Sequence, residues 1–195
     1  MKLGSGPILL FVGRIQPLKG LDVAVRTLAE LGRADAQLVV VGGASGLEGA
    51  TELARVQLLI EELGLVDRVK FYEPQPHHLL STFYRAADVV LVPSRSESFG
   101  LVALEAAACG IPVVATAVGG LLNLIEDGKT GFLVPGRDVS GFVRFTRRLL
   151  DDSLLAISMG TAAAHRAQMY SWKSAAMKAR SVYTELLERD LVACS

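Results

Sequence analysis

Short apolar runs alternate along the chain with longer segments in which apolar residues recur every three or four positions. The apolar runs predict strands at Ile8–Gly13, Gln37–Gly42, Val69–Tyr72, Asp88–Pro93, Ile111–Ala115 and Phe132–Val134. The amphipathic segments predict helices at Lys19–Gly32, Glu48–Leu63, Leu79–Ala87, Gly100–Cys109, Val139–Leu150, Ser153–Gln168 and Ser171–Arg189. This alternation of strand and helix is typical of an α/β domain.

Most of the predicted strands are unbroken apolar runs without in-out alternation. Strands of this kind are buried on both faces, as in a parallel sheet covered by helices. We therefore expect one doubly wound, Rossmann-like α/β domain over residues 7–195, after a linker or cloning remnant at residues 1–6. Ligands of such sheets bind beyond the carboxyl ends of the strands. The loops expected at that edge are 13–19, 42–49, 73–78, 93–100 and 116–121.

Composition narrows the class of protein. Hydrophobic residues make up 51% of the 195 residues, which excludes a disordered chain. The 20 Lys and Arg balance the 20 Asp and Glu, so there is no electrostatic footprint for nucleic acid or an anionic membrane. The apolar runs fall far short of the ~20 residues of a membrane span. Two cysteines are too few for a disulfide framework, which favours a reducing, cytoplasmic location.

Two cations, Arg14 and Lys19, lie in the loop after the first predicted strand. A cation at a helix start opposes the helix dipole, and an anion held between the cations and the free amides would remove that cost. The alternative is a pair of solvated surface cations. The loop lacks the P-loop pattern, and the glycines at 42–46 lack the G-x-G-x-x-G spacing, which disfavours an NAD-linked oxidoreductase.

Two glutamates flank the start of the predicted helix at Gly100–Cys109. Glu105 lies among apolar residues, where a carboxylate is costly unless it is hydrogen-bonded. Because carboxylates accept hydrogen bonds from sugar hydroxyls, Glu97 and Glu105 are suited to bind two hydroxyl-bearing parts of one ligand. The alternatives are a helix-capping role for Glu97 and a buried ion pair with Lys or Arg for Glu105.

These residues carry a resemblance to a known family. Glu97 and Glu105 form an E-x7-E motif, and further matching segments are GRIQPLK (13–19), VVGGASG (40–46), YRAADVVLVPS (84–94), GIPVVATAVGGL (110–121) and GKTGFLV (128–134). Together they resemble a large family of retaining glycosyltransferases with the GT-B fold, over nearly the whole chain from Gly6. Within it the chain looks most similar to actinobacterial enzymes of mycothiol biosynthesis, which transfer N-acetylglucosamine from UDP-GlcNAc to inositol phosphate. Sucrose-phosphate synthases share a looser version.

The resemblance implies the C-terminal, donor-binding half of a GT-B fold and a role for each matching residue. The catalytic positions would be Arg14 and Lys19, which bind the donor diphosphate and stabilise the leaving UDP, and Glu97, which contacts the donor sugar. Glu105 would hold the ribose and Gln75 the uracil. The remaining substrate-binding positions are Gly13, Ser98, Phe99, Gly100 and Leu101. No metal or cofactor is implied, because the donor, UDP-GlcNAc or another UDP-sugar, is a substrate.

The predicted helix at Ser171–Arg189 carries an apolar stripe, formed by Trp172, Ala176, Ala179, Tyr183 and Leu186–Leu187. The stripe would pack on the chain's own sheet or form an uncovered interface, since in this family the final helix contacts the N-terminal domain. We expect that acceptor-binding N-terminal domain to be absent, so that this chain binds a sugar nucleotide without turning it over. A stand-alone, non-catalytic UDP-sugar binding module predicts the same motifs, and a homodimer stays open.

Overall fold

The computed structural model describes residues 6–188 and has the expected order of strands and helices. The strands are β1 (Ile8–Val12), β2 (Gln37–Val41), β3 (Val69–Tyr72), β4 (Val89–Val92), β5 (Val113–Thr116) and β6 (Phe132–Val134). The helices are α1 (Leu21–Glu30), α2 (Gly49–Glu62), α3 (His77–Ala86), α4 (Leu101–Ala108), α5 (Leu121–Leu124), α6 (Val139–Asp151), α7 (Ser153–Ala167), the short 3-10 helix η1 (Gln168–Tyr170) and α8 (Trp172–Glu188).

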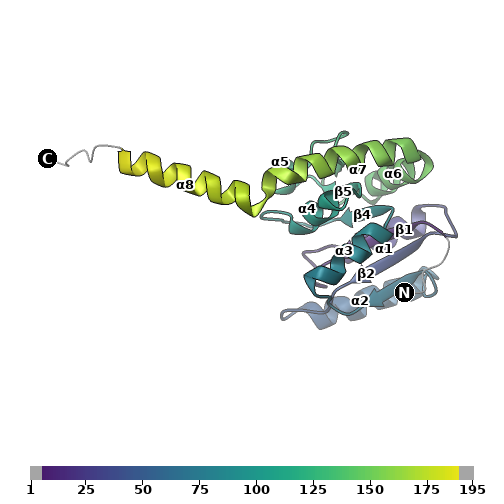
Figure 1. Ribbon diagram of the computed structural model, residues 1–195. Coiled ribbons are helices and arrows are strands. Elements are labelled where there is room, and N and C mark those ends of the chain that lie inside the picture. Colours follow the sequence, from purple (N-terminus) through teal and green to yellow (C-terminus); the bar gives the residue numbers. More distant parts are fainter. Residues whose placement is uncertain (1–5, 189–195) are drawn as a thin grey trace.

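The strands form one parallel sheet in the order β3-β2-β1-β4-β5-β6. Helices cover both faces (Figure 1). Alternate residues of each inner strand belong to two different apolar clusters. Leu38 and Val40 belong to the apolar cluster that includes residues of α1, α2 and α6, whereas Val39 and Val41 belong to the cluster that includes residues of α3, α4 and α5. This double burial explains the unbroken apolar runs and confirms the doubly wound α/β fold. Helix α7 packs against α4 and α6.

Helix starts at the carboxyl edge of the sheet differ from the expected ones by one or two residues. Gly20 and Gly100 have left-handed backbones, with φ of 73° and 97°, so α1 begins at Leu21 and α4 at Leu101. Lys19 therefore lies in the loop ahead of α1 rather than in its first turn. The four-residue helix α5 was not expected, because it is too short to show a helical period.

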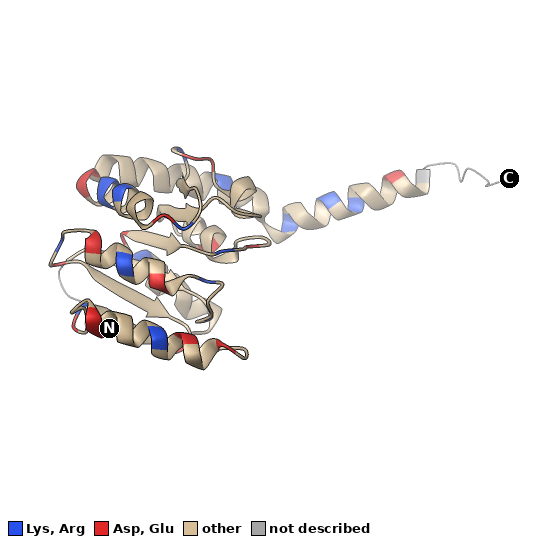
Figure 2. Ribbon diagram, turned by 180° about the vertical axis from the view of Figure 1, so that it is seen from behind, with Lys and Arg blue, Asp and Glu red and all other residues tan. Residues whose placement is uncertain are grey.

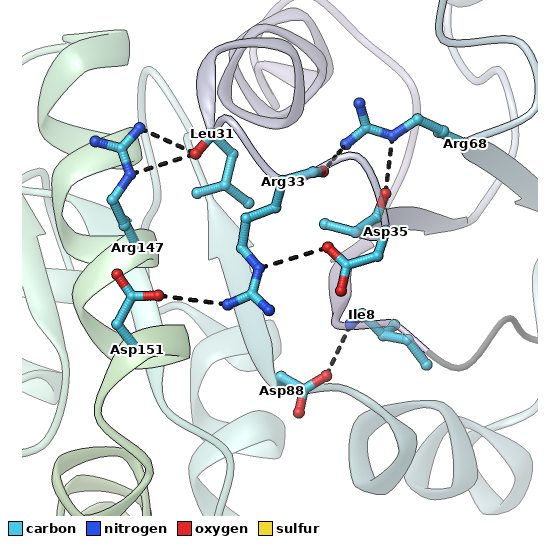
Figure 3. Close-up of polar contacts among 9 residues, drawn as sticks. Ile8, Leu31, Arg33, Asp35, Arg68, Asp88, Arg147 and Asp151 are labelled. Carbon is cyan, nitrogen blue, oxygen red and sulfur yellow. Dashed lines mark hydrogen bonds and ion pairs between the residues drawn. The ribbon is translucent and has the colours of Figure 1, made fainter.

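A polar network closes the opposite, amino-terminal edge of the sheet (Figure 3). Arg147 of α6 donates two hydrogen bonds to the Leu31 carbonyl, at 3.3 and 3.0 Å, and the Ile8 amide donates to an Asp88 carboxylate oxygen at 2.7 Å. These bonds satisfy backbone groups where helices end and strands begin. Figure 2 shows Lys and Arg interspersed with Asp and Glu over the helices, without a face of one sign.

Helix α8 leaves the body of the molecule after η1 and extends away from it (Figure 1). Its apolar side chains are exposed: 91% of Trp172, 67% of Tyr183 and 86% of Leu187 are open to solvent. The expectation that this stripe packs on the chain's own sheet is therefore wrong, because the helix points past the sheet instead of lying along it. In the described part of the chain, no helix is long and apolar enough to cross a membrane.

Candidate functional site

The loops after β1 and β4 meet at the centre of the carboxyl edge, where the strand order reverses. This switch point is where doubly wound sheets bind ligands. The Arg95 amide donates to the Leu18 carbonyl at 2.8 Å, which ties the two loops together. A Cβ on Gly20 would lie only 2.2 Å from the Pro93 carbonyl oxygen, so only glycine lets the two backbones approach this closely.

Lys19 and Glu97 lie across this junction and bind each other. The Lys19 ammonium donates to Glu97 Oε2 at 2.7 Å, and the two side chains are 20% and 15% exposed. The sequence predicted both residues for one site, although 78 positions separate them. The alternative capping role of Glu97 is wrong, because the cap of α4 is Gly100 and no side chain hydrogen-bonds to the first turn.

The loop that carries Glu97 rests on two glycines that follow β5. The Gly120 amide donates to the Glu97 carbonyl at 2.8 Å. A Cβ on Gly119 would lie 2.0 Å from that same carbonyl oxygen, and one on Gly120 would lie 2.5 Å from Phe99 Cα. The Glu97 loop is therefore held in place by close packing against this glycine pair.

Arg14 lies on the rim of a cleft of about 440 Å³ beside this junction. Gly13, Arg14, Gln75 and the backbone at 42–45 line the cleft, together with Leu80 of α3. The Ile15 amide donates to the Gly43 carbonyl at 2.9 Å, which extends the β1–β2 pairing into the loops and fixes the backbone on the C-terminal side of Arg14. Within the described residues Arg14 is exposed and has no hydrogen-bonded or ionic partner.

Glu105 lies in the second turn of α4, with its side chain 29% exposed. The Tyr84 hydroxyl donates to Glu105 Oε2 at 2.7 Å, and Nδ1 of the exposed His77 lies 3.4 Å from Oε1. Among the residues that the structure describes, Glu105 has no Lys or Arg partner, so the alternative of a buried ion pair with either is wrong. A neutral donor, not a cation, holds this carboxylate.

The start of α4 completes the predicted set. Ser98, Phe99 and Leu101 are exposed at this edge, and no side chain caps the helix. Helix α6 offers a contrast, because the Asp138 carboxylate accepts bonds from the first amides of that helix. The Ser140 hydroxyl also donates to this carboxylate, and its hydrogen bond, followed by those of the amides, lowers the Asp138 pKa. The uncapped amides of α4 and the positive end of its dipole are suited to an anion.

Sequence reasoning missed an ionic network behind α1. Asp22, in the first turn of α1, accepts a hydrogen bond from Arg137 and lies 3.4 Å from Arg55 Nη2. Arg55 also donates two hydrogen bonds of 2.8 Å to the buried Glu52, and these raise the Arg55 pKa. The only sign of this network in the sequence is the spacing of Glu52 and Arg55, three residues apart on one predicted helix. These two arginines brace α1 instead of facing the cleft.

Histidines and acids do not gather into a metal site in the described chain. Within residues 6–188, no three His, Cys, Asp or Glu side chains lie close enough together to hold a metal ion. The site thus consists of two cations, two carboxylates and a helix start at one sheet edge.

Comparison with known proteins shows which family this chain matches. Residues 2–166 match the model of the family described as Glycosyl transferases group 1. The chain belongs to this family. It is 47% identical over 189 residues to a D-inositol 3-phosphate glycosyltransferase of Acidothermus cellulolyticus, covering 94% of this chain and 42% of that protein. The chain thus spans less than half the length of this curated relative.

Solved structures of glycosyltransferases share the fold. A sucrose-phosphate synthase from Thermosynechococcus elongatus aligns with a TM-score of 0.87 at 38% identity, over 94% of this chain and 46% of that one. Anabaena HepE, in complex with UDP-glucose, gives 0.84 at 25% identity, over 92% and 48%. The C-terminal domain of a group 1 glycosyltransferase from Francisella tularensis gives 0.76 at 25% identity, over 85% and 86%. The chain therefore has the fold of a GT-B C-terminal domain.

Proposed function

We propose that this chain is the donor-binding domain of a retaining glycosyltransferase and that it binds a UDP-sugar at the carboxyl edge of its sheet. One observation carries the proposal: Lys19 and Glu97 bind each other at the switch point, beside the uncapped start of α4 and the unpaired Arg14. A cation pair next to free helix amides fits a diphosphate, and an adjacent carboxylate fits sugar hydroxyls.

The diphosphate lies between Arg14, Lys19 and the amides of Phe99, Gly100 and Leu101 in this proposal. Negative charge grows on the diphosphate as the bond to the sugar breaks, and fixed cations stabilise that charge. Glu97 then turns from Lys19 to the hydroxyls of the donor sugar. The leaving phosphate helps to deprotonate the acceptor, as the family resemblance implies, and neither glutamate is assigned as a general acid.

The nucleoside occupies the cleft beside Arg14. Its volume of about 440 Å³ and its apolar walls, Val12, Val41 and Leu80, suit a flat base, with Gln75 at the edge of the uracil. Gln75 Nε2 donates to the Glu73 carbonyl at 2.9 Å, which leaves the side-chain carbonyl of Gln75 available to accept a bond from the base. Glu105 accepts the ribose hydroxyls.

The relatives support a choice of donor and acceptor. UDP-glucose is bound in the HepE structure, which supports a UDP-sugar, and we propose UDP-GlcNAc as the donor. The name of the Acidothermus relative supports inositol phosphate as the acceptor. The likeness to a sucrose-phosphate synthase, at 38% identity, favours a second candidate, transfer to a sugar phosphate. Both acceptors carry a phosphate and hydroxyls.

A second domain completes the enzyme in this proposal. The chain spans 42% of the Acidothermus relative, and the exposed stripe of α8 supports an N-terminal, acceptor-binding domain that covers it. We therefore expect this chain alone to bind the donor without transferring the sugar. The same motifs also suit a binding module without catalysis, and glycosyl transfer by the chain joined to its N-terminal partner separates these two candidates.

Isothermal titration calorimetry tests the donor site. We expect UDP to bind, and Arg14→Ala and Lys19→Ala each to weaken binding about 10- to 100-fold, the loss of a charge-assisted hydrogen bond to phosphate. Arg26→Ala is the matched control, because Arg26 is an exposed cation of α1 without a partner in the described chain. No UDP binding, or equal affinities in all three variants, would contradict the proposal.

A further inference from the structure

Tyr84 is a buried tyrosine with one polar partner. It lies on α3 with 1% of its surface exposed, inside the apolar cluster between the sheet and α3, α4 and α5. A phenol in such a place needs a hydrogen-bond partner, and its hydroxyl finds Glu105 Oε2 at 2.7 Å. Burial, followed by the Glu105 carboxylate, raises the Tyr84 pKa far above its usual range, so the hydroxyl stays a donor.

Among the described residues, Glu105 is the only ionisable side chain that hydrogen-bonds to this hydroxyl, and it comes from the neighbouring helix. A carboxylate that rotates freely presents its oxygens in many directions. The hydrogen bond to Oε2 restricts the orientation of the Glu105 carboxylate plane. Oε1, which has the exposed His77 Nδ1 at 3.4 Å, and the second lone pair of Oε2 can each still accept a bond. A ribose offers two adjacent hydroxyls as donors, which match two acceptors of fixed direction.

We propose that Tyr84 is a positioning residue for nucleotide recognition: its hydroxyl sets the plane of Glu105 so that this carboxylate accepts both hydroxyls of a ribose. The inference rests on the proposed donor site and adds to it the group that makes the site selective for ribonucleotides. Tyr84 itself touches no substrate, because its ring lies within the core. Its effect on binding therefore passes through Glu105 alone.

The test compares UDP with 2′,3′-dideoxy-UDP, which lacks both ribose hydroxyls, by calorimetry. In Tyr84→Phe we expect the affinity for UDP to fall about three- to tenfold while the affinity for dideoxy-UDP stays unchanged. Glu105→Ala should abolish the preference for UDP, and adding Tyr84→Phe to it should change nothing further. If Tyr84 had only a structural role, Tyr84→Phe would weaken the binding of both nucleotides equally and leave the ratio of their affinities unchanged.

Tyr170→Phe is the matched control. It removes a tyrosine hydroxyl that donates to the Asn123 carbonyl at 3.1 Å and keeps the ring that contacts Phe99. We expect it to leave the ratio of UDP to dideoxy-UDP affinity unchanged. If Tyr84→Phe keeps the wild-type ratio of UDP to dideoxy-UDP affinity while Glu105→Ala loses it, the proposed role of Tyr84 is wrong and the donor site still stands. A wild-type protein without any preference for UDP overturns the ribose role of Glu105 and this inference with it.

A measurement on the wild-type protein tests the same inference if Tyr84→Phe does not fold. The buried Tyr84 hydroxyl proton, bonded to a carboxylate, should give a downfield proton resonance that exchanges slowly with water. We expect this resonance to persist when UDP saturates the site, because Glu105 binds ribose while still held by Tyr84. Loss of the resonance on UDP binding would show that Glu105 leaves Tyr84 to reach the nucleotide, and would overturn the inference.

Discussion

The two glutamates of one motif are held by different chemistry. Glu97 binds the Lys19 cation at a loop junction, whereas Glu105 accepts a hydrogen bond from a neutral, buried phenol. An ion pair at a partly exposed position is worth little net energy, so a ligand exchanges it at low cost. A carboxylate bonded to a buried side chain keeps its place. Glu97 is therefore suited to change partners during binding, and Glu105 to stay fixed.

Replacing Glu97 tests this difference. In Glu97→Gln the Lys19 ammonium loses its internal competitor, so UDP should bind about two- to fivefold more tightly, the value of one such ion pair. The ratio of UDP-GlcNAc to UDP affinity should fall, because an amide accepts sugar hydroxyls less well than a carboxylate. Calorimetry with both nucleotides measures both effects.

Glu126→Gln is the control for Glu97→Gln. Glu126 accepts from Lys129 at 2.6 Å on an exposed loop, so the substitution removes an ion pair of the same kind away from the site. It should leave both affinities unchanged. Weaker UDP binding in Glu97→Gln, with a steady ratio of the two nucleotides, would show that Glu97 supports the diphosphate site instead of the sugar.

The sequence predicted that the candidate polar residues lie at one sheet edge, but it did not predict their partners. Arg14, Lys19, Glu97 and Glu105 follow from a cation at a helix start, carboxylates near apolar helix residues and a family motif. The bond from Lys19 to Glu97 joins positions 78 residues apart, and only the folded sheet brings them together. Tyr84 carried no signal of its own, because a single tyrosine in an amphipathic helix is as often packed in the core as used in a site.

At the scale of elements, backbone contacts between loops shape the site. Glycines supply the close approaches: Gly20 against Pro93, and the glycine pair at 119–120 against the Glu97 loop. Short apolar runs, most of them unbroken, predicted all six strands of the described sheet, and periodicity predicted the long helices. The exact helix starts were not predicted because they depend on glycine backbones. Helix α5 was not predicted because its four residues make little more than one turn.

Gly119→Ala tests whether the 119–120 glycine pair holds the Glu97 loop in place. The new Cβ would lie 2.0 Å from the Glu97 carbonyl oxygen, so the loop must shift, and the left-handed backbone, with φ of +48°, adds strain. We expect a loss of about 1–2 kcal/mol in the free energy of unfolding, measured by denaturation, from the strain alone. UDP-GlcNAc binding should weaken as well, because the shifted loop no longer presents Glu97 to the donor sugar.

Gly128→Ala separates strain from displacement. Its φ of +74° imposes a similar strain, but no atom lies within 4 Å of the added Cβ. This variant should lose comparable stability and keep wild-type affinity for UDP-GlcNAc. Equal affinities in the two variants would mean that the 119–120 glycines do not hold the Glu97 loop.

At the scale of the whole molecule, two different surfaces remain open. The carboxyl edge presents the donor site, and α8 presents an apolar stripe that makes few contacts with the body (Figure 1). Both apolar clusters are built without α8, so the α/β body has its own core. The direction of α8 could not be predicted from its stripe, because the same period serves packing on the chain's own sheet and packing on another domain.

Trp172 reports on the position of α8. It is the single tryptophan of the chain and is 91% exposed. We expect its fluorescence emission to match that of free tryptophan in water and to be quenched fully by acrylamide. A blue-shifted, protected emission would mean that α8 is covered, by the chain itself or in a homodimer, and sedimentation would separate these two cases.

The most direct test of the account is a map of where UDP binds. In ¹H–¹⁵N NMR spectra of the assigned protein, UDP at saturation should shift the amides of residues 13–20, 42–46, 73–78 and 97–101 at the carboxyl edge. Amides of α7, on the outside of the molecule, should not move. Shifts confined to the outer helices, or none at saturating UDP, would contradict the donor site.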